Sequence, residues 1–274
     1  MTAGDPGQGQ GRRVEANGVD TYYEVDGTAD GEPVLLLHGG FVTIESWAPQ
    51  RAALAGRYRL YLPERRGHGR TPDVAGPISY RVMAEDTIAF MEAIGLPSAH
   101  LVGWSDGAIV ALEVALARPE SVRSLVLIGT AAHIDGWTAE SRAEAATMTP
   151  ASLPPFIREN YDRLSPDGPD HFPVVFERLL AEWRTEPRHE MAELAAVSAR
   201  TLILIGDRDG VTVEHAAAMQ RAIRGAQLAV VPGADHFLTF QKPDLANRLI
   251  LDFLAESDEA SAAHQPQPDE GARS

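Results

Sequence analysis

Short apolar runs and helical spacings alternate along most of the chain. The runs at 34–37 (VLLL), 122–128 (VRSLVLI) and 200–205 (RTLILI) are almost continuously apolar, as is typical of strands buried on both faces. Residues 80–94 instead repeat apolar side chains at helical spacing and stop at Gly95. The predicted strands span residues 19–25, 34–37, 58–62, 100–102, 122–128, 200–205 and 227–231, and the predicted helices span 80–94, 108–117 and 245–254. Strands separated by helices predict an α/β fold with a mostly parallel central sheet.

One segment departs from this alternation. Residues 133–196 carry scattered aromatic side chains among prolines and charges, with helical but no strand character. We interpret them as a small helical cap over the strand ends; the alternative is a set of ordinary α/β helices. The predicted core then comprises residues 13–132 and 197–256. The Gly/Gln-rich composition of residues 1–12 predicts a disordered N-terminus. The polar, acidic composition of residues 257–274 predicts a disordered acidic tail.

Composition and charge exclude several classes of function. The chain has 274 residues, 44% of them hydrophobic, and no cysteine, so it can build a full core but has no disulfide or cysteine nucleophile. The net charge of −15 makes nucleic acid and anionic membranes poor partners. The first residues lack a signal peptide's apolar core, and no apolar run is long enough to cross a membrane. We expect a cytoplasmic protein with a small-molecule partner and no nucleic-acid or membrane partner; a homodimer is left open.

The stretch LVGWSDGAIV at residues 101–110 carries the first chemical signal. It places the pattern G-x-S-x-G between a predicted strand and a predicted helix. The two glycines allow a sharp turn that holds Ser105 at the strand end, beside backbone N–H groups of the next helix. This context favours a serine nucleophile over a simple helix-capping serine.

A serine nucleophile requires a base and a group that orients the base. In this architecture they follow in the order serine, acid, histidine, each after a strand. GDRDG follows the strand at 200–205, and GADHF follows the strand at 227–231. His236 is therefore the candidate base, and the acid lies in GDRDG.

Taken together, these motifs resemble those of the α/β-hydrolase superfamily. The resemblance covers residues 14–255 and rests on HGG at 38–40, RRGHG at 65–69, GWSDG at 103–107, GDRDG at 206–210 and GADHF at 233–237. It implies the α/β-hydrolase fold, with a mostly parallel central sheet flanked by helices and a small helical cap inserted after the sixth strand.

The resemblance also implies roles for single residues. It assigns the catalytic acid to Asp209, with Asp207 as the alternative, and the oxyanion-hole amides to Gly40 and Asp106. It makes His38 a structural residue of the oxyanion loop.

The loop after residue 62 departs mildly from the family's D-x-R-G-x-G-x-S pattern. Glu64 and Thr71 occupy its first and last positions. We expect Arg66 to form a structural ion pair, and we assign no chemical role to Arg66 or His68.

Asp106 is the oddest residue of the elbow, because a carboxylate there repels a developing oxyanion. It is a poor nucleophile candidate, since the glycines would be out of register around it. Two interpretations stay open: it braces the elbow, or it recognises a substrate amine. The second follows from a resemblance of GWSDG to the amino-acid-ester hydrolase subgroup that includes valacyclovir hydrolase.

The pocket is the least defined part of the site. We expect Phe41, Trp137 and Phe176 to line it, and Trp104 and Trp47 to serve packing. Nothing in the sequence implies a cofactor or a metal site.

We therefore predict a serine hydrolase that cleaves a carboxylic ester or lactone through an acyl-enzyme. The alternatives are a C–C bond hydrolase of the meta-cleavage type, a perhydrolase or acyltransferase on the same triad, and a slow-turnover ligand sensor of the same fold.

Overall fold

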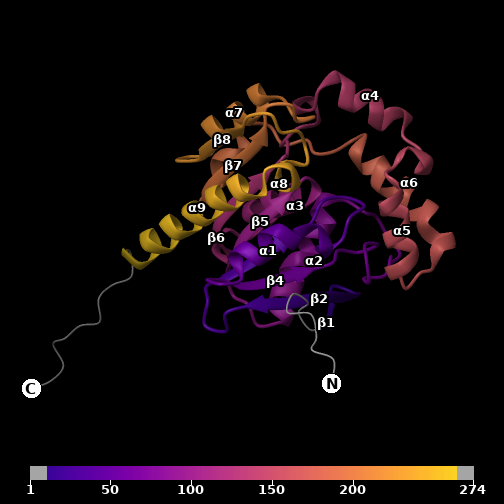
Figure 1. The fold of residues 1–274 in the computed structure, drawn as a ribbon, viewed down its shortest axis with the longest axis horizontal. Coiled ribbons are helices and arrows are strands. Elements are labelled where there is room, and N and C mark those ends of the chain that lie inside the picture. Colours follow the sequence, from indigo (N-terminus) through magenta and orange to yellow (C-terminus); the bar gives the residue numbers. More distant parts are fainter. Residues whose placement is uncertain (1–10, 264–274) are drawn as a thin grey trace, which may run out of the picture.

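A computed structural model describes residues 11–263, which form one sheet covered by helices (Figure 1). The sheet has eight strands in the order β1-β2-β4-β3-β5-β6-β7-β8. The pairs β1–β2 and β2–β4 are antiparallel, and all other neighbouring strands are parallel. The strands are β1 (Gly11–Ala16), β2 (Val19–Gly27), β3 (Pro33–Leu37), β4 (Arg59–Pro63), β5 (Ala99–Trp104), β6 (Val122–Ile128), β7 (Arg200–Gly206) and β8 (Gln227–Val231). The predicted mostly parallel sheet is confirmed.

The α-helices follow the strands as the alternation predicts. They are α1 (Ala48–Leu54), α2 (Tyr80–Ala93), α3 (Asp106–Ala117), α4 (Ala139–Thr147), α5 (Pro155–Leu164), α6 (Phe172–Trp183), α7 (Val213–Ala222), α8 (Leu238–Gln241) and α9 (Pro243–Ala263). None of these helices is long and apolar enough to cross a membrane.

The two faces of the sheet build two separate apolar layers. Alternate residues of β3 face opposite layers because side chains alternate along a strand. Leu35 and Leu37 belong to the layer that contains residues of α2 and α3, whereas Val34 and Leu36 belong to the layer that contains residues of α1 and α9. Continuous apolar strands are the result of burying both faces.

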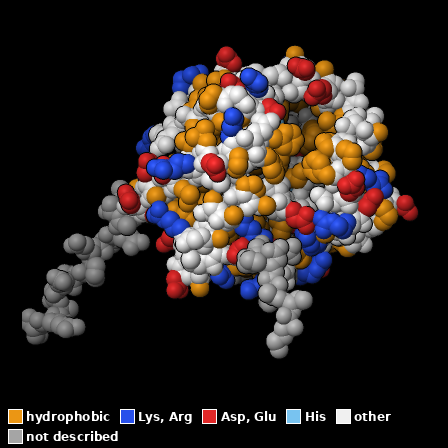
Figure 2. Space-filling model, viewed as in Figure 1, with side chains coloured by type: hydrophobic (Ala, Val, Ile, Leu, Met, Phe, Trp, Pro, Cys, Tyr) orange, Lys and Arg blue, Asp and Glu red, His pale blue; other side chains and the backbone are white. Residues whose placement is uncertain are grey.

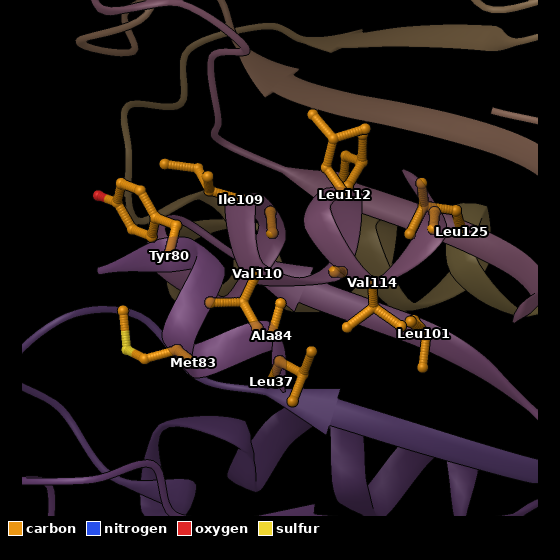
Figure 3. Packing of buried hydrophobic residues seen from close by; sticks show 14 of the residues in the cluster. Leu37, Tyr80, Met83, Ala84, Leu101, Ile109, Val110, Leu112, Val114 and Leu125 are labelled. Carbon is orange, nitrogen blue, oxygen red and sulfur yellow. The ribbon is translucent and has the colours of Figure 1, made fainter. Parts of the chain in front are cut away.

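Helix α3 is the most deeply buried helix of the first layer. Figure 3 shows its side chains Val110 and Val114 close to Ala84 of α2 and to Leu37 and Leu101 of the sheet. The tight packing of α3 helps to fix the position of Ser105, because the first residue of the helix directly follows the serine.

The insertion between β6 and β7 contains α4, α5 and α6, which lie together on one side of the molecule (Figure 1). Among the described residues it contributes only isolated β-bridges, His133 with Arg188 and Trp137 with Val211. It follows the sixth strand, where the cap was expected; the boundaries 133–196 stay a prediction.

Three strands or helices of six or more residues outside the insertion were not predicted from the sequence, and the four-residue α8 was also missed. β1 is an edge strand with a polar, largely exposed sequence, GRRVEA. α1 buries only Gln50 and Leu54, and α7 buries only Ala216 and Met219. In all three, too few apolar side chains face the core to give a periodic signal.

The ordered part extends further at both ends than the sequence suggested. Gly11 and Arg12, placed in the disordered N-terminus, pair with Glu24 and Tyr23 in the sheet. Helix α9 continues through Ala263, beyond the predicted start of the tail at residue 257. The remainder of both predicted disordered segments, 1–10 and 264–274, lies outside the described residues.

Candidate active site

The turn between β5 and α3 holds Ser105 in a strained conformation. Its φ and ψ angles are 56° and −122°, a region that non-glycine residues rarely adopt. The Ser105 amide donates to Ile128 O in β6 at 2.8 Å. The glycines on either side are needed for clearance: a Cβ at Gly103 would lie 2.3 Å from Gly107 O, and one at Gly107 would lie 2.0 Å from Leu37 O. GWSDG thus fits a turn in which backbone segments approach closely around the serine.

Ser105, His236 and Asp209 lie in one hydrogen-bonded chain. Asp209 follows β7 and His236 follows β8, so both lie at the same carboxyl edge of the sheet as Ser105. His236 Nε2 is 2.9 Å from Ser105 Oγ, and His236 Nδ1 is 2.9 Å from Asp209 Oδ1. An ionised carboxylate only accepts, so Nδ1 carries the proton and Nε2 accepts from the serine hydroxyl. A general base needs this tautomer.

Asp207, the alternative acid, makes a different contact. Its Oδ1 accepts a hydrogen bond from Gly233 N at 2.7 Å. Asp207 therefore ties the turn after β7 to the loop that carries His236. The structure brings Asp209, and not Asp207, to the imidazole.

The surroundings of His236 favour its charged form. Burial alone lowers the pKa of the imidazole, but the hydrogen bond and charge of Asp209, with the charges of Asp106 and Asp235, raise that pKa above its ordinary value. The same carboxylates would stabilise the imidazolium that forms when His236 takes a proton.

Two tryptophans flank His236. Trp104 donates from Nε1 to His236 O at 2.9 Å and is otherwise buried, so it fixes the histidine loop, in line with its expected packing role. The centre of the Trp137 ring lies 5.6 Å from the centre of the imidazole.

The two amides predicted for the oxyanion hole have no protein acceptor within residues 11–263. Asp106 N is the first amide of α3, and the opening amides of a helix have no intrahelical partner. Gly40 lies beside the Asp106 side chain: a Cβ at Gly40 would come within 2.4 Å of Asp106 Oδ2 and 2.6 Å of the Trp183 ring. The Asp106 amide also lies at the positive end of the α3 dipole.

The Asp106 side chain is held from two sides. Tyr80 Oη in α2 donates to Oδ1 at 3.0 Å, and Trp183 Nε1 in α6 donates to Oδ2 at 3.0 Å. Burial raises the pKa of Asp106, although the charge of Arg65 and these hydrogen bonds oppose the rise. The sequence did not indicate Tyr80 or Trp183, which come from distant segments with no motif.

A cavity of about 600 Å³ opens above the serine. Figure 2 shows a hollow surrounded by apolar side chains on the face where the insertion between β6 and β7 meets the rest of the chain. The lining includes Ser105 and His236 at the base, with Trp137 as expected. Its other aromatic residues are Tyr80, Trp183 and Phe237, its acidic residues are Asp106, Glu140, Glu144, Glu186, Asp209 and Asp235, and its basic residues are Arg142 and Arg208.

Phe41 and Phe176 do not line this cavity, contrary to our expectation. Phe176 is fully buried on the inner face of α6, and its ring stacks on Phe41 with centres 5.5 Å apart. Phe41 also meets the Trp183 ring edge-on at 5.0 Å. The two phenylalanines pack behind the cavity wall, because the apolar face of α6 is buried against the core and does not face the cavity.

Helix α4 closes the cavity with little packing against the core: none of its side chains is buried, and Ala145 is its partly buried hydrophobic residue that contacts the core. Its N-terminus is tied to the catalytic-acid loop by Thr138 N, which donates to Gly210 O at 2.7 Å. At its other end Arg184 donates to Ala145 O and Ala146 O, each at 3.2 Å. The helix is held by its ends.

The loop after β4 has the structural contacts that we expected. Arg66 pairs with Asp86 through Nε at 2.6 Å and Nη2 at 2.7 Å. Glu64 accepts from Arg70 Nη1 at 2.6 Å, and Thr71 Oγ1 donates to Glu64 O at 2.8 Å, so both departures from the family pattern are accommodated. His68 is buried away from Ser105, with Nδ1 2.9 Å from Arg66 O.

Comparison with known proteins identifies the class of protein. Residues 34–249 match the Alpha/beta hydrolase family. The chain therefore belongs to the alpha/beta hydrolase family, which confirms the resemblance drawn from its motifs, and the protein is a hydrolase of this fold.

Individual relatives within the family differ in their named activities. The chain is 29% identical over 265 residues to a putative carbamate hydrolase RutD from Azorhizobium caulinodans, covering 88% of this chain and 97% of that protein. It is 26% identical over 253 residues to carboxylesterase YbfK from Bacillus subtilis, covering 85% and 84%. A mutant of the meta-cleavage product hydrolase CumD from Pseudomonas fluorescens, complexed with acetates, has a TM-score of 0.78 at 25% identity, covering 90% of this chain and 98% of that one.

Proposed function

We propose that the protein is a serine hydrolase that cleaves a carboxylic ester or lactone through an acyl-enzyme. The observation that carries this proposal is the chain of hydrogen bonds from Ser105 through His236 to Asp209, beside two amides that lack a protein acceptor. Carboxylesterase YbfK is among the relatives of the chain, which supports an ester substrate.

The mechanism follows from the positions of these groups. Ser105 Oγ attacks the carbonyl carbon while His236 Nε2 takes its proton and Asp209 stabilises the imidazolium. The amides of Gly40 and Asp106 donate to the oxygen that becomes negative. His236 then gives its proton to the leaving oxygen, and water attacks the acyl-enzyme by the same route.

We assign the Asp106 carboxylate to bracing, because Tyr80 and Trp183 engage both of its oxygens. The competing role, recognition of a substrate amine, makes a different prediction. If Asp106 binds an amine, Asp106→Asn lowers kcat/KM for an α-amino ester far more than for its matched ester without the amine. If Asp106 braces the elbow, the two substrates lose activity equally.

The direct test measures hydrolysis of p-nitrophenyl esters of graded chain length by the wild type and by Ser105→Ala. A fluorophosphonate label, located by mass spectrometry, reports the nucleophile. We expect turnover and labelling at Ser105, with both lost in the variant. Labelling without turnover would overturn the esterase proposal in favour of a transferase, a C–C bond hydrolase or a sensor. Absence of labelling would overturn the assignment of Ser105 as the nucleophile.

A C–C bond hydrolase is the second candidate, favoured by the similarity to the meta-cleavage product hydrolase CumD. The same triad would serve it, so the site geometry does not separate the two. Turnover of a vinylogous diketone that exceeds turnover of every ester in the series would favour this candidate.

A further inference from the structure

Arg65 lies buried behind the oxyanion loop and has no part in the mechanism above. Only 5% of the residue is exposed. Its Nη2 donates to Gly39 O at 3.0 Å, and its Nη1 donates to His38 O. His38 Nδ1 adds a second hydrogen bond to Gly39 O at 2.8 Å, while His38 Nε2 accepts from Arg65 N at 3.2 Å. The carbonyls of the HGG segment are therefore held from one side.

The orientation of these carbonyls determines where the Gly40 amide points. In a trans peptide the C=O of one residue and the N–H of the next point in opposite directions. Because Gly39 O faces Arg65, the N–H of Gly40 faces away from Arg65. Gly39 itself lies beside the nucleophile, since a Cβ on it would be 3.5 Å from Ser105 Cβ.

A Gly-Gly peptide has little intrinsic preference between its two orientations, because neither residue has a Cβ. A rotated peptide would present an oxygen where the mechanism needs an N–H. The hydrogen bonds from Arg65 and His38 to Gly39 O oppose that rotation.

Resting on the proposed function, we propose that Arg65 is a positioning residue that orients the Gly39–Gly40 peptide so that its N–H serves the oxyanion hole. Arg65 touches no reacting atom and acts through Gly40.

The charges around Arg65 are balanced. Burial lowers its pKa, while the negative charge of Asp106 opposes the fall. Glu182 is 4% exposed, and neither carboxyl oxygen has a hydrogen-bond partner in the described residues. Burial and the charge of Asp106 raise the pKa of Glu182 to about 9, so it is neutral at pH 7. One guanidinium then faces one carboxylate, and Arg65 also offsets the repulsion that Asp106 would exert on the oxyanion.

The neighbouring Arg66 is a matched control. It has the same 5% exposure and also bonds bidentately, but its partner is the Asp86 carboxylate and not the oxyanion loop. Loss of either arginine removes a buried charge, but only loss of Arg65 removes a hydrogen bond to Gly39 O.

The test compares Arg65→Met, Arg65→Lys and Arg66→Lys with the wild type. We expect Arg65→Met to lower kcat by roughly 100- to 1000-fold, as loss of one oxyanion donor does, with KM changed less than about threefold. Arg65→Lys keeps the charge but replaces the two-pronged guanidinium with a single ammonium group, and we expect a loss of about tenfold by the same reasoning. Affinity for a trifluoromethyl ketone, whose adduct with the serine carries an oxyanion, should fall by the same factor as kcat/KM.

Thermal unfolding separates folding from positioning. Arg66→Lys should lose stability while keeping kcat within about threefold of the wild type. If Arg65→Met does not fold, the kcat and ketone affinity of Arg65→Lys still test the proposal. The proposal is overturned if the folded Arg65 variants retain kcat, or if their ketone affinity does not follow kcat/KM. A wild type that neither turns over esters nor labels at Ser105 would instead overturn the proposed function, so the two failures are distinguishable.

Discussion

The carboxyl edge of the sheet and helix α4 form opposite walls of one cavity, and they are built in different ways. At the sheet edge, Ser105 is buried, its backbone is strained, and close contacts at Gly103 and Gly107 leave no room for another residue. Helix α4 buries no side chain and is held by hydrogen bonds at its two ends.

This difference separates chemistry from selectivity. Groups that must be placed within a fraction of an ångström belong on rigid elements with locked neighbours. A helix with little packing can change its exposed residues at small cost in stability. We therefore expect substitutions at the sheet edge to affect turnover and folding strongly, and substitutions on α4 to affect the choice of substrate.

The largest expected effect is at Asp209, the proposed catalytic acid. Asp209→Asn should lower kcat by about 10⁴-fold, because an amide favours the wrong imidazole tautomer and does not stabilise the imidazolium. The measurement is steady-state hydrolysis of the best p-nitrophenyl ester. Asp207→Asn, two residues away, is the control and should keep kcat within about tenfold. Equal losses in both variants would contradict the assignment of Asp209.

The second comparison lies inside the insertion between β6 and β7, between helices α6 and α4. Phe176 is fully buried in α6, so Phe176→Ala should lower the free energy of unfolding by about 3–5 kcal/mol. Glu144→Ala in α4 should change it by less than about 0.5 kcal/mol. Urea unfolding of both variants measures the difference. If Phe176→Ala costs as little as Glu144→Ala, α6 does not belong to the core of the fold.

The pH profile tests the charges around the base. Protonated His236 cannot accept the serine proton, so kcat/KM should rise with pH and level off through an inflection above 6.5, the ordinary pKa of histidine, because carboxylates raise its pKa. Below the inflection the rate should change about tenfold per pH unit. Asp235→Asn removes one of these charges and should move the inflection to lower pH. An inflection below 6.5 in the wild type would contradict the net effect of the carboxylates.

The sequence predicted those parts of the fold and site that depend on local pattern. The buried strands were recognisable because both of their faces are apolar, and the candidates Ser105 and His236 because each follows a predicted strand within a short motif. The choice of Asp209 over Asp207 came from the family resemblance. The edge strand β1 was missed because its exposed residues are polar.

The contacts that support the site depend on tertiary structure, which a single sequence does not display. Tyr80, Asp106 and Trp183 meet from α2, α3 and α6 with no motif in common. Phe176 was placed in the pocket because an aromatic residue in a cap can face either side of its helix. Arg65 and Arg66 are identical neighbours, and only the fold gives one the oxyanion loop and the other Asp86.

The smallest expected effect concerns the charge of the substrate. Glu140 and Glu144 of α4 line the cavity with four other acidic residues and two arginines, so its potential should favour cations over anions. Acetylcholine and 3,3-dimethylbutyl acetate share an acyl group and a shape and differ by one positive charge. We expect Glu140→Gln/Glu144→Gln to lower the ratio of their kcat/KM values by roughly two- to fivefold, with an effect that shrinks as salt is added, because both side chains are exposed.

Glu159 and Glu177 provide the matched control, because they are exposed on α5 and α6 but do not line the cavity. Glu159→Gln/Glu177→Gln removes the same charge from the cap and should leave the ratio unchanged. If both double variants lower the ratio equally, the net charge of the protein determines the preference rather than the wall of the cavity. If neither double variant lowers the ratio, the aromatic lining determines the preference for the charged substrate. The expectation that α4 controls the choice of substrate is then wrong for substrate charge.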